Sequence, residues 1–186
     1  MGIKTPESFD PFTDRTARDI RNSLSEAFVK TIGAKNRAAY LSVARQWREQ
    51  NLSSLHSDYI DDRLLRYENV FNAIQTGEIV DALQQALIIW NQGLFFEFHD
   101  HLEAIWKSAS GDMRQALKGL IKAAGVYIHL EQDHRQAAQS LAHKAFVLLQ
   151  QYHHCLTFMA NLEALLNKLK TIDPDPPQLD MASFGH

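Results

Sequence analysis

Apolar residues recur along most of the chain at the three- to four-residue spacing of amphipathic helices. The first clear stripe consists of Ala17, Ile20, Leu24, Phe28 and Ile32. Asp10 and Pro11 before the stripe indicate a helix start, and Gly33 after it indicates a helix end. No stretch alternates apolar and polar residues for long enough to predict a β-strand. The pattern therefore predicts an all-α protein.

Short breaks divide this pattern into seven or eight helices, which is typical of antiparallel neighbours in a compact helical bundle. The expected helices cover residues 10–33, 34–50, 54–75, 78–91, 94–107, 111–129, 135–155 and 157–170. The sixth helix contains Gly119 and Gly125 in its interior. Each glycine costs about 1 kcal/mol relative to alanine, so the pair indicates that another helix approaches closely.

Four parts are expected along the chain. They are an N-terminal helical extension that packs on the core (1–75), a helical core domain (76–155), a C-terminal helix (156–172) and a flexible tail (173–186). The tail begins with Asp-Pro-Asp-Pro-Pro. That acidic, proline-rich composition favours a linker or a disordered end over a packed element.

Composition places the chain among ordinary globular proteins. Its 186 residues are 45% hydrophobic and 22% charged, which suffices for one domain with a core of its own. A net charge of −3 without a long basic run argues against nucleic acid as a partner. The sequence contains neither a signal segment nor a run of about 18 apolar residues, so we expect a cytoplasmic protein with no membrane partner. The single cysteine, Cys155, excludes an internal disulfide.

The most unusual chemistry lies in the expected helix at residues 94–107. A rotation of about 100° per residue gathers an apolar arc of Phe95, Phe98, Leu102, Ile105 and Trp106. His99 falls inside this arc, and Glu103 lies one turn further on, flanked by Phe96. The wheel turns the remaining residues away from the arc, namely Glu97, Asp100, His101 and Ala104. A histidine and a carboxylate at positions i and i+4 on an apolar face therefore mark the candidate site.

The same region resembles a known family. Residues 91–106 read Asn-Gln-Gly-Leu-Phe-Phe-Glu-Phe-His-Asp-His-Leu-Glu-Ala-Ile-Trp. This run is similar to the signature of the bacterial and archaeal domain-of-unknown-function 309 family, which has a glycine, aromatic residues, a histidine with an acidic neighbour, Leu-Glu and a tryptophan. The similarity continues through Arg114 and residues 117–121 to about residue 150. The resemblance implies a compact all-helical domain and no established activity.

The chain departs from the family pattern at a few polar positions. Asp100 stands where the family usually has glutamate, and Lys118 and Lys122 stand where it has glutamines. Asp133 and His134 replace a Gly-Asn turn. A polar site that used those glutamines would be altered in this chain.

The preferred interpretation of the His99 and Glu103 pair is structural. A histidine on an apolar arc must satisfy its ring nitrogens, and Glu103 is an available acceptor. Arg114 lies at the edge of the next helix's apolar arc, where it could pair with Glu103. Such a network fixes helix register while adding little net stability.

A metal site is the second interpretation. His99 and Glu103 would be two ligands, His129 a third, and Glu97 or Asp100 a fourth, because helical bundles build metal sites from facing helices. On the helical wheel, Glu97 and Asp100 lie about 60–160° away from the arc of the pair, and two further observations argue against a metal site. Lys118 and Lys122 share a face with His129 and would repel a cation, and no His-Glu-x-x-His motif is present.

An acid–base site is the third interpretation. His99 would act as a general base oriented by Glu103, and Arg114 would bind an anion, with Trp106 and His129 as further ligand contacts. No serine, threonine or cysteine nucleophile falls in a recognisable sequence setting.

The function predicted from the sequence is therefore protein or small-ligand interaction at a partly buried cluster of His99, Glu103 and Arg114. The alternative is a metal-dependent or acid–base enzyme of the hydrolase type that uses His99 and Glu103. No cofactor is expected, and a divalent metal belongs to that alternative alone. Residues 51–110 carry nine Asp or Glu and three Lys or Arg, and this acidic middle would suit a homo-oligomer.

Overall fold

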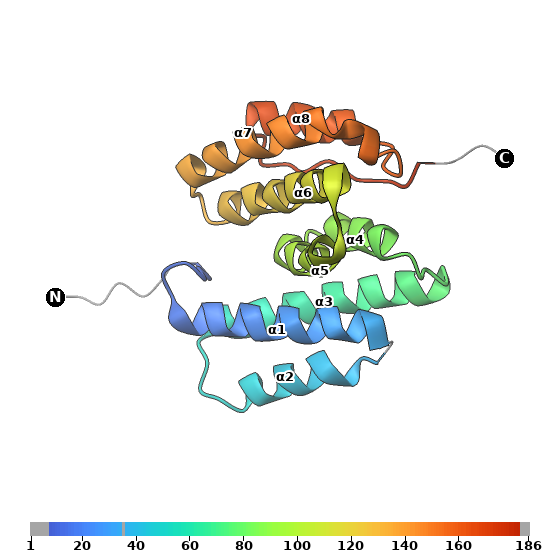
Figure 1. Ribbon diagram of the computed structural model, residues 1–186. Helices are drawn as coiled ribbons and strands as arrows, with labels where there is room; N and C mark the ends of the chain where they lie inside the picture. Colours follow the sequence, from blue (N-terminus) through green and yellow to red (C-terminus); the bar gives the residue numbers. More distant parts are fainter. Residues whose placement is uncertain (1–7, 35, 183–186) are drawn as a thin grey trace. The chain divides into compact units, whose positions relative to one another are not determined.

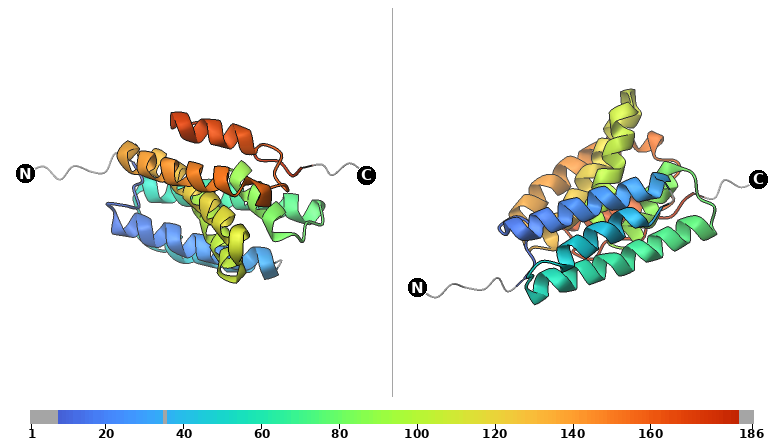
Figure 2. Two further views of the ribbon diagram at one scale, coloured as in Figure 1. Left: turned by 45° about the horizontal axis from the view of Figure 1, so that its top comes forward. Right: turned by 90° about the horizontal axis from the view of Figure 1, so that it is seen from below.

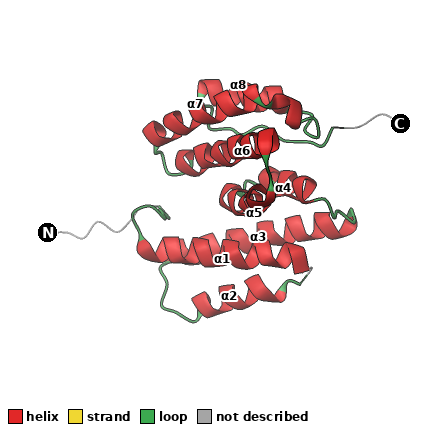
Figure 3. Ribbon diagram, in the orientation of Figure 1, coloured by secondary structure: helices red, strands yellow, loops and turns green. Residues whose placement is uncertain are grey.

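The computed structural model describes residues 8–34 and 36–182. The chain divides into two compact units, residues 1–72 and 73–186. The described residues form eight α-helices and no strand (Figures 1 and 3). The prediction of an all-α protein with seven to eight helices is confirmed.

The first unit consists of α1 (Arg15–Ala34), α2 (Ala38–Arg48) and most of α3 (Ser54–Thr76). One aromatic ring from each helix meets in its core. Phe28 of α1 stacks on Tyr67 of α3 with ring centroids 4.0 Å apart, and Tyr40 of α2 meets Tyr67 edge-on at 5.4 Å. All three rings are fully buried. The Tyr40 hydroxyl donates to the Glu68 carboxylate at 2.6 Å, so its polar end is satisfied.

The start of α1 differs from the sequence expectation. Asp10 accepts a hydrogen bond from the Phe12 backbone N–H at 2.8 Å within a turn, and the helix begins only at Arg15. Asp14 is the capping residue, because its Oδ1 accepts from the backbone N–H groups of Thr16 and Ala17 at 2.7 and 3.3 Å. The choice of Asp10 and Pro11 as the helix start was therefore wrong, because two aspartates four residues apart are both good caps and only Asp14 contacts the free N–H groups.

The second unit contains α4 (Ala82–Asn91), α5 (Phe95–Ser108), α6 (Gly111–Leu130), α7 (Arg135–Gln151) and α8 (Leu162–Thr171), with a short 3₁₀ helix η1 (His153–Cys155) after α7. The most extensive packing joins α6 to α7, and both views in Figure 2 keep these helices side by side. The helix expected at 135–155 ends at Gln151 in the structure, and the helix expected at 156–172 begins only at Leu162. Leu156 and Met159 are buried in the intervening irregular segment.

Aromatic rings from three helices form the core of the second unit. Trp90 of α4 meets Phe95 and Phe98 of α5 edge-on, with ring centroids 5.0 and 5.1 Å apart. Tyr127 of α6 meets Trp90 at 5.3 Å and stacks on Phe95 at 5.1 Å. These rings fix the mutual positions of α4, α5 and α6.

The α6–α7 contact depends on a small residue, as the sequence indicated. A Cβ added at Gly119 would lie 2.9 Å from Cδ2 of Leu149 and 3.2 Å from Cβ of Leu148. A Cβ at Gly125 would meet only Cδ1 of Leu141, at 3.1 Å. Of the two interior glycines of α6, Gly119 is thus the one that α7 approaches more tightly.

The segment after α8 differs from the expected flexible tail over residues 173–182; residues 183–186 lie outside the described part. The segment runs back along the unit to the residues that precede α8 (Figure 1). Pro177 and Leu179 are buried. The Trp90 indole N–H donates to the Pro177 carbonyl at 2.8 Å, and the Asn91 amide exchanges two 2.8 Å hydrogen bonds with the Leu179 backbone. Side chains of α4 thus supply hydrogen-bond partners to backbone groups of this proline-rich segment, which forms no regular secondary structure of its own.

We expect Gly119→Ala to destabilise the protein despite the better helix propensity of alanine. Overpacking costs about 1–3 kcal/mol, against a propensity gain of about 1 kcal/mol, so a net loss of up to about 2 kcal/mol is expected in urea-induced unfolding. Gly125→Ala is the matched control on the same helix, because the Leu141 methyl group can turn away. Equal stabilities of the two variants would contradict the tight α6–α7 contact.

We expect Asn91→Ala to release the C-terminal segment, because it removes both hydrogen bonds to Leu179. Two part-buried hydrogen bonds are worth about 1–3 kcal/mol. Amide hydrogen exchange in residues 178–182 should therefore accelerate about tenfold or more, while exchange in α6 stays unchanged. Asn161→Ala, which removes exposed hydrogen bonds to the same segment, should have a smaller effect. Unaltered exchange in Asn91→Ala would show that Asn91 does not hold the segment.

Candidate functional site

The buried face of α5 is turned from the face that the helical wheel predicted. Its buried residues are Phe95, Glu97, Phe98, His101 and Leu102. The prediction that Glu97 and His101 point away is therefore wrong. His99 and Glu103 lie at the edge of the buried face, with side chains 30% and 41% exposed. The wheel weighs apolarity alone, whereas the buried face also depends on polar partners supplied by neighbouring elements.

Different interactions accompany the burial of His101 and of Glu97 on this face. Nε2 of His101 lies 3.0 Å from the Ala82 carbonyl of α4, which accepts a hydrogen bond from it. Burial lowers the pKa of His101, although the bond to Ala82 acts in the opposite direction. Glu97 stands in the first turn of α5, where the helix dipole favours a carboxylate. Apolar spacing could not predict that these two polar residues are buried. The acceptor for His101, in particular, comes from another helix.

The predicted pair of His99 and Glu103 exists, with a geometry typical of a surface ion pair. Nε2 of His99 lies 4.0 Å from Oε1 of Glu103, and Nδ1 lies 3.2 Å from Oδ1 of Asp100. Glu103 also pairs with Lys107 at 3.6 Å. Half-exposed pairs of this kind contribute about 0–1 kcal/mol. These groups therefore form a solvent-facing row of polar side chains along α5.

Arg114 does not form the predicted ion pair with Glu103. Its guanidinium lies over the Trp106 ring at 4.0 Å, and its Nη1 donates to the Ala109 carbonyl at 3.2 Å. Within the described residues, His99 and Lys107 are the ion partners of Glu103. Arg114 and Trp106 instead close the turn between α5 and α6 through a cation–π contact.

His129 is not brought together with His99 and Glu103 as a metal centre. No group of three or more His, Cys, Asp or Glu side chains within residues 8–34 and 36–182 could hold a metal ion. The neighbour of the His129 ring is His134, with ring centroids 5.8 Å apart. The pKa of His129 is lowered by burial and by the His134 charge.

A lysine pocket lies on α6 and α7, outside the residues that the sequence singled out as a site. It has a volume of about 300 Å³ and is lined by Lys118, Lys122, His143, Lys144, Val147 and Leu148. Within the described residues, the three ammonium groups have no carboxylate partner. Burial and the charges of Lys118 and Lys144 lower the pKa of Lys122. Lys144 joins the other two only because α7 packs on α6, so spacing along one helix could not reveal the cluster.

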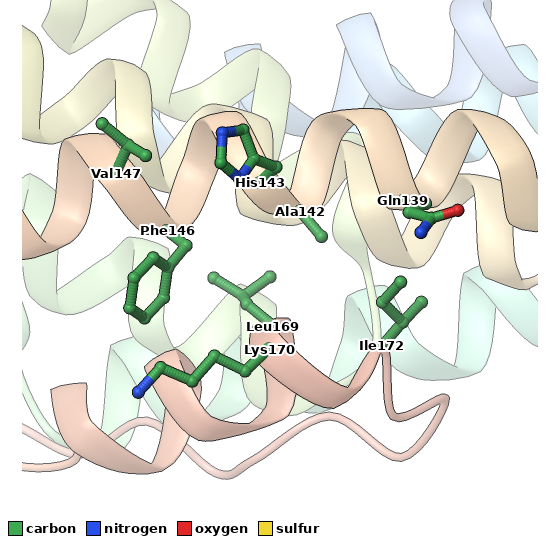
Figure 4. A pocket seen from close by; sticks show the side chains of 8 residues that line it. All are labelled: Gln139, Ala142, His143, Phe146, Val147, Leu169, Lys170 and Ile172. Atoms are coloured by element: carbon green, nitrogen blue, oxygen red, sulfur yellow. The ribbon is translucent and has the colours of Figure 1, made fainter.

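An apolar pocket adjoins the lysine pocket and has a volume of about 410 Å³. In Figure 4, Ala142 and Phe146 of α7 face Leu169 and Lys170 of α8 across it. Its remaining lining residues are Gln139, His143, Val147 and Ile172. The Lys170 ammonium lies 4.9 Å from the Phe146 ring centroid. His143 and Val147 line both pockets, so the two pockets are neighbours on α7.

Comparison with known proteins identifies a family match in the second unit. Residues 83–141 match the model of a family described as Domain of unknown function (DUF309). The match confirms the resemblance inferred from the sequence motif, and it extends from α4 into α7. No curated protein and no solved structure matches the chain. In the part that the structure describes, no helix is both long and apolar enough to cross a bilayer.

We expect stability to fall as the pH falls below about 6.5, the pKa of an unperturbed histidine. The lowered pKa of His101 means that the unfolded chain takes up a proton there before the folded chain does. The free energy of unfolding should then decrease by up to about 1.4 kcal/mol per pH unit. Urea unfolding at pH 7.5 and pH 5.5 measures this loss. His101→Gln should reduce it, whereas His153→Gln, at an exposed position, should not. Equal pH dependence in His101→Gln and the parent protein would contradict this assignment.

Proposed function

We propose that the second unit is a binding domain for a small organic anion. The observation that carries this proposal is the lysine pocket, where three ammonium groups share one concavity without a carboxylate partner among the described residues. Other lysines of the same unit are paired, such as Lys107 with Glu103 and Lys168 with Asp173. An unneutralised cluster favours a negatively charged ligand over a neutral one.

The electrostatics of Lys122 support the proposal. Its pKa is lowered because burial and two neighbouring lysines disfavour its charged form. A bound anion would replace this repulsion by attraction. Unit charges 4 Å apart attract by on the order of 4 kcal/mol near a protein surface, before desolvation is subtracted. Two or three lysines can therefore offset the desolvation of a phosphate or a carboxylate.

The adjoining apolar pocket supports a ligand with a hydrocarbon or aromatic portion. Phe146 and Leu169 face that pocket, and His143 stands where it meets the lysine pocket. Apolar ligand surface buried there contributes about 25 cal/mol per Å². The combination favours a ligand with a charged head and an apolar body.

For His99 and Glu103 we infer a structural role. Their separation of 4.0 Å and their partial exposure resemble a surface ion pair that supports one face of α5. Arg114 would serve the α5–α6 turn through its contact with Trp106. This leaves the outer surface of α6, α7 and α8 as the preferred ligand site.

Three probes test the proposed ligand class by isothermal titration calorimetry: decyl phosphate below its micellar concentration, decanol and inorganic phosphate. We expect decyl phosphate to bind one to one and at least about tenfold more tightly than either fragment. The double variant Lys118→Gln/Lys144→Gln should weaken decyl phosphate binding about tenfold, which is about 1.4 kcal/mol. Added salt should weaken binding as well.

A matched double variant removes the same charge elsewhere. Lys30→Gln/Lys107→Gln replaces two lysines that are paired with glutamates, so it should bind decyl phosphate as the parent protein does. Equal weakening in both double variants would contradict a specific anion site, because only net charge would then matter. Equal binding of decanol and decyl phosphate would contradict any role for the lysines.

A further inference from the structure

A chain of hydrogen bonds joins three side chains at the N-terminal ends of α1 and α3 in the first unit. Oγ of Ser53 lies 2.8 Å from Nδ1 of His56, and Nε2 of His56 lies 2.8 Å from Oδ2 of Asp14. The His56 and Asp14 side chains are 13% and 24% exposed, whereas Ser53 is exposed to solvent. A hydroxyl group, an imidazole and a carboxylate thus lie in the order that acyl-transfer enzymes use, with the two ring nitrogens exchanged relative to the serine proteases.

The positions of the protons follow from Asp14. Burial raises the pKa of its carboxyl group, but hydrogen bonds from His56, Ala17 and Thr16 outweigh burial and lower it. Asp14 is therefore ionised near neutral pH and can only accept. Nε2 of His56 must then carry the ring proton of the neutral imidazole, which leaves Nδ1 as an acceptor for the hydroxyl proton of Ser53. The imidazole is oriented to act as a general base toward Ser53.

Backbone donors stand next to the hydroxyl group. Ser53 immediately precedes α3, and the first hydrogen bond of that helix runs from the Ser57 N–H to the Ser53 carbonyl. The backbone N–H groups of Ser54 and Leu55 have no acceptor among the described residues. Donors at a helix N-terminus favour negative charge. In serine hydrolases, the N–H of the residue after the nucleophile stabilises the oxyanion.

We propose that Ser53 is a nucleophile for acyl transfer from small esters, with His56 as its general base and Asp14 as the residue that orients the base. Oγ of Ser53 attacks the ester carbonyl carbon while its proton passes to Nδ1 of His56. The tetrahedral oxyanion collapses, the ester C–O bond breaks, and the leaving alkoxide takes that proton. Water then attacks the acyl-serine by the same route, which releases the carboxylic acid and restores Ser53.

The surroundings favour a small, apolar acyl group. Phe9 stands edge-on to His56 with ring centroids 5.9 Å apart, and it stacks on Tyr59 at 3.7 Å. These rings form an apolar wall beside the base. Because Ser53 is exposed, a small ester can reach its hydroxyl group without a deep binding cavity.

Helix capping is the competing explanation for the same contacts. Ser53 Oγ also lies 3.5 Å from the His56 backbone N–H, which is the position of a capping contact. If capping were its only role, Ser53 would be no more reactive than Ser54, its exposed neighbour. The two explanations therefore predict different reactivities for the Ser53 hydroxyl group, although both predict that Ser53 stabilises the start of α3.

The test treats the full-length protein with a fluorophosphonate, which bonds to the oxygen of an activated serine as fluoride leaves. Peptide mass spectrometry then locates the adduct. We expect labelling at Ser53 and a burst of nitrophenolate from p-nitrophenyl acetate. Both should fall at least about a hundredfold in His56→Gln, as expected when a general base is lost.

Two further variants separate reactivity from folding. Asp14→Asn keeps a good helix cap but removes the charge, so it should lower the labelling rate while the melting temperature stays close to that of the parent. Ser54→Ala should leave labelling unchanged. No adduct at Ser53, or equal labelling in His56→Gln and the parent protein, would overturn the proposal and leave capping as the explanation.

Discussion

Trp90 is the residue on which the second unit most depends, because it is engaged through both its ring and its indole N–H. The ring contacts aromatic residues of α5 and α6. The N–H holds the Pro177 carbonyl from a segment 87 residues further along the chain. Burying an indole without an acceptor would cost on the order of 1–3 kcal/mol. The C-terminal segment thus supplies the acceptor that lets the aromatic core close.

The charges of the second unit fall into two groups. Along α5, the Glu103 carboxylate is paired with the Lys107 ammonium at 3.6 Å and lies 4.0 Å from the His99 ring. On α6 and α7, Lys118, Lys122 and Lys144 repel one another in the absence of a counter-charge from the described residues. Neutralised charges contribute little beyond local order, whereas an unneutralised cluster is a source of affinity for anions. This contrast explains why the proposed site lies on α6–α7 and not at His99.

Helix capping contributes to both order and chemistry in the first unit. Asp14 accepts from two of the free N–H groups of α1, those of Thr16 and Ala17, with one oxygen and from His56 with the other. The same carboxylate therefore caps the N-terminus of α1 and orients the imidazole of His56. With Nε2 of His56 bonded to Asp14, the other ring nitrogen, Nδ1, faces the exposed hydroxyl group of Ser53.

The sequence by itself determined the secondary structure and the family match. Helical spacing of apolar residues and the positions of glycines gave the number of helices and most of their ranges, because these signals act within a few residues of one another. The motif at residues 91–106 identified the region that the family model matches. Gly119 was correctly recognised as a point of close helix contact, since a helix tolerates an interior glycine mainly where packing requires it.

Only the tertiary structure decided which side chains meet. Apolar spacing placed His99 on the buried face of α5, yet the Ala82 carbonyl from α4 allowed His101 to be buried there. The composition of residues 173–182 favoured disorder, but Asn91 and Trp90 supplied the hydrogen bonds that hold the segment. Lys144 joined Lys118, and Asp14 joined His56, across different helices. Local spacing determines one helix at a time, whereas a polar group is buried, paired or left charged by partners that are distant in the sequence.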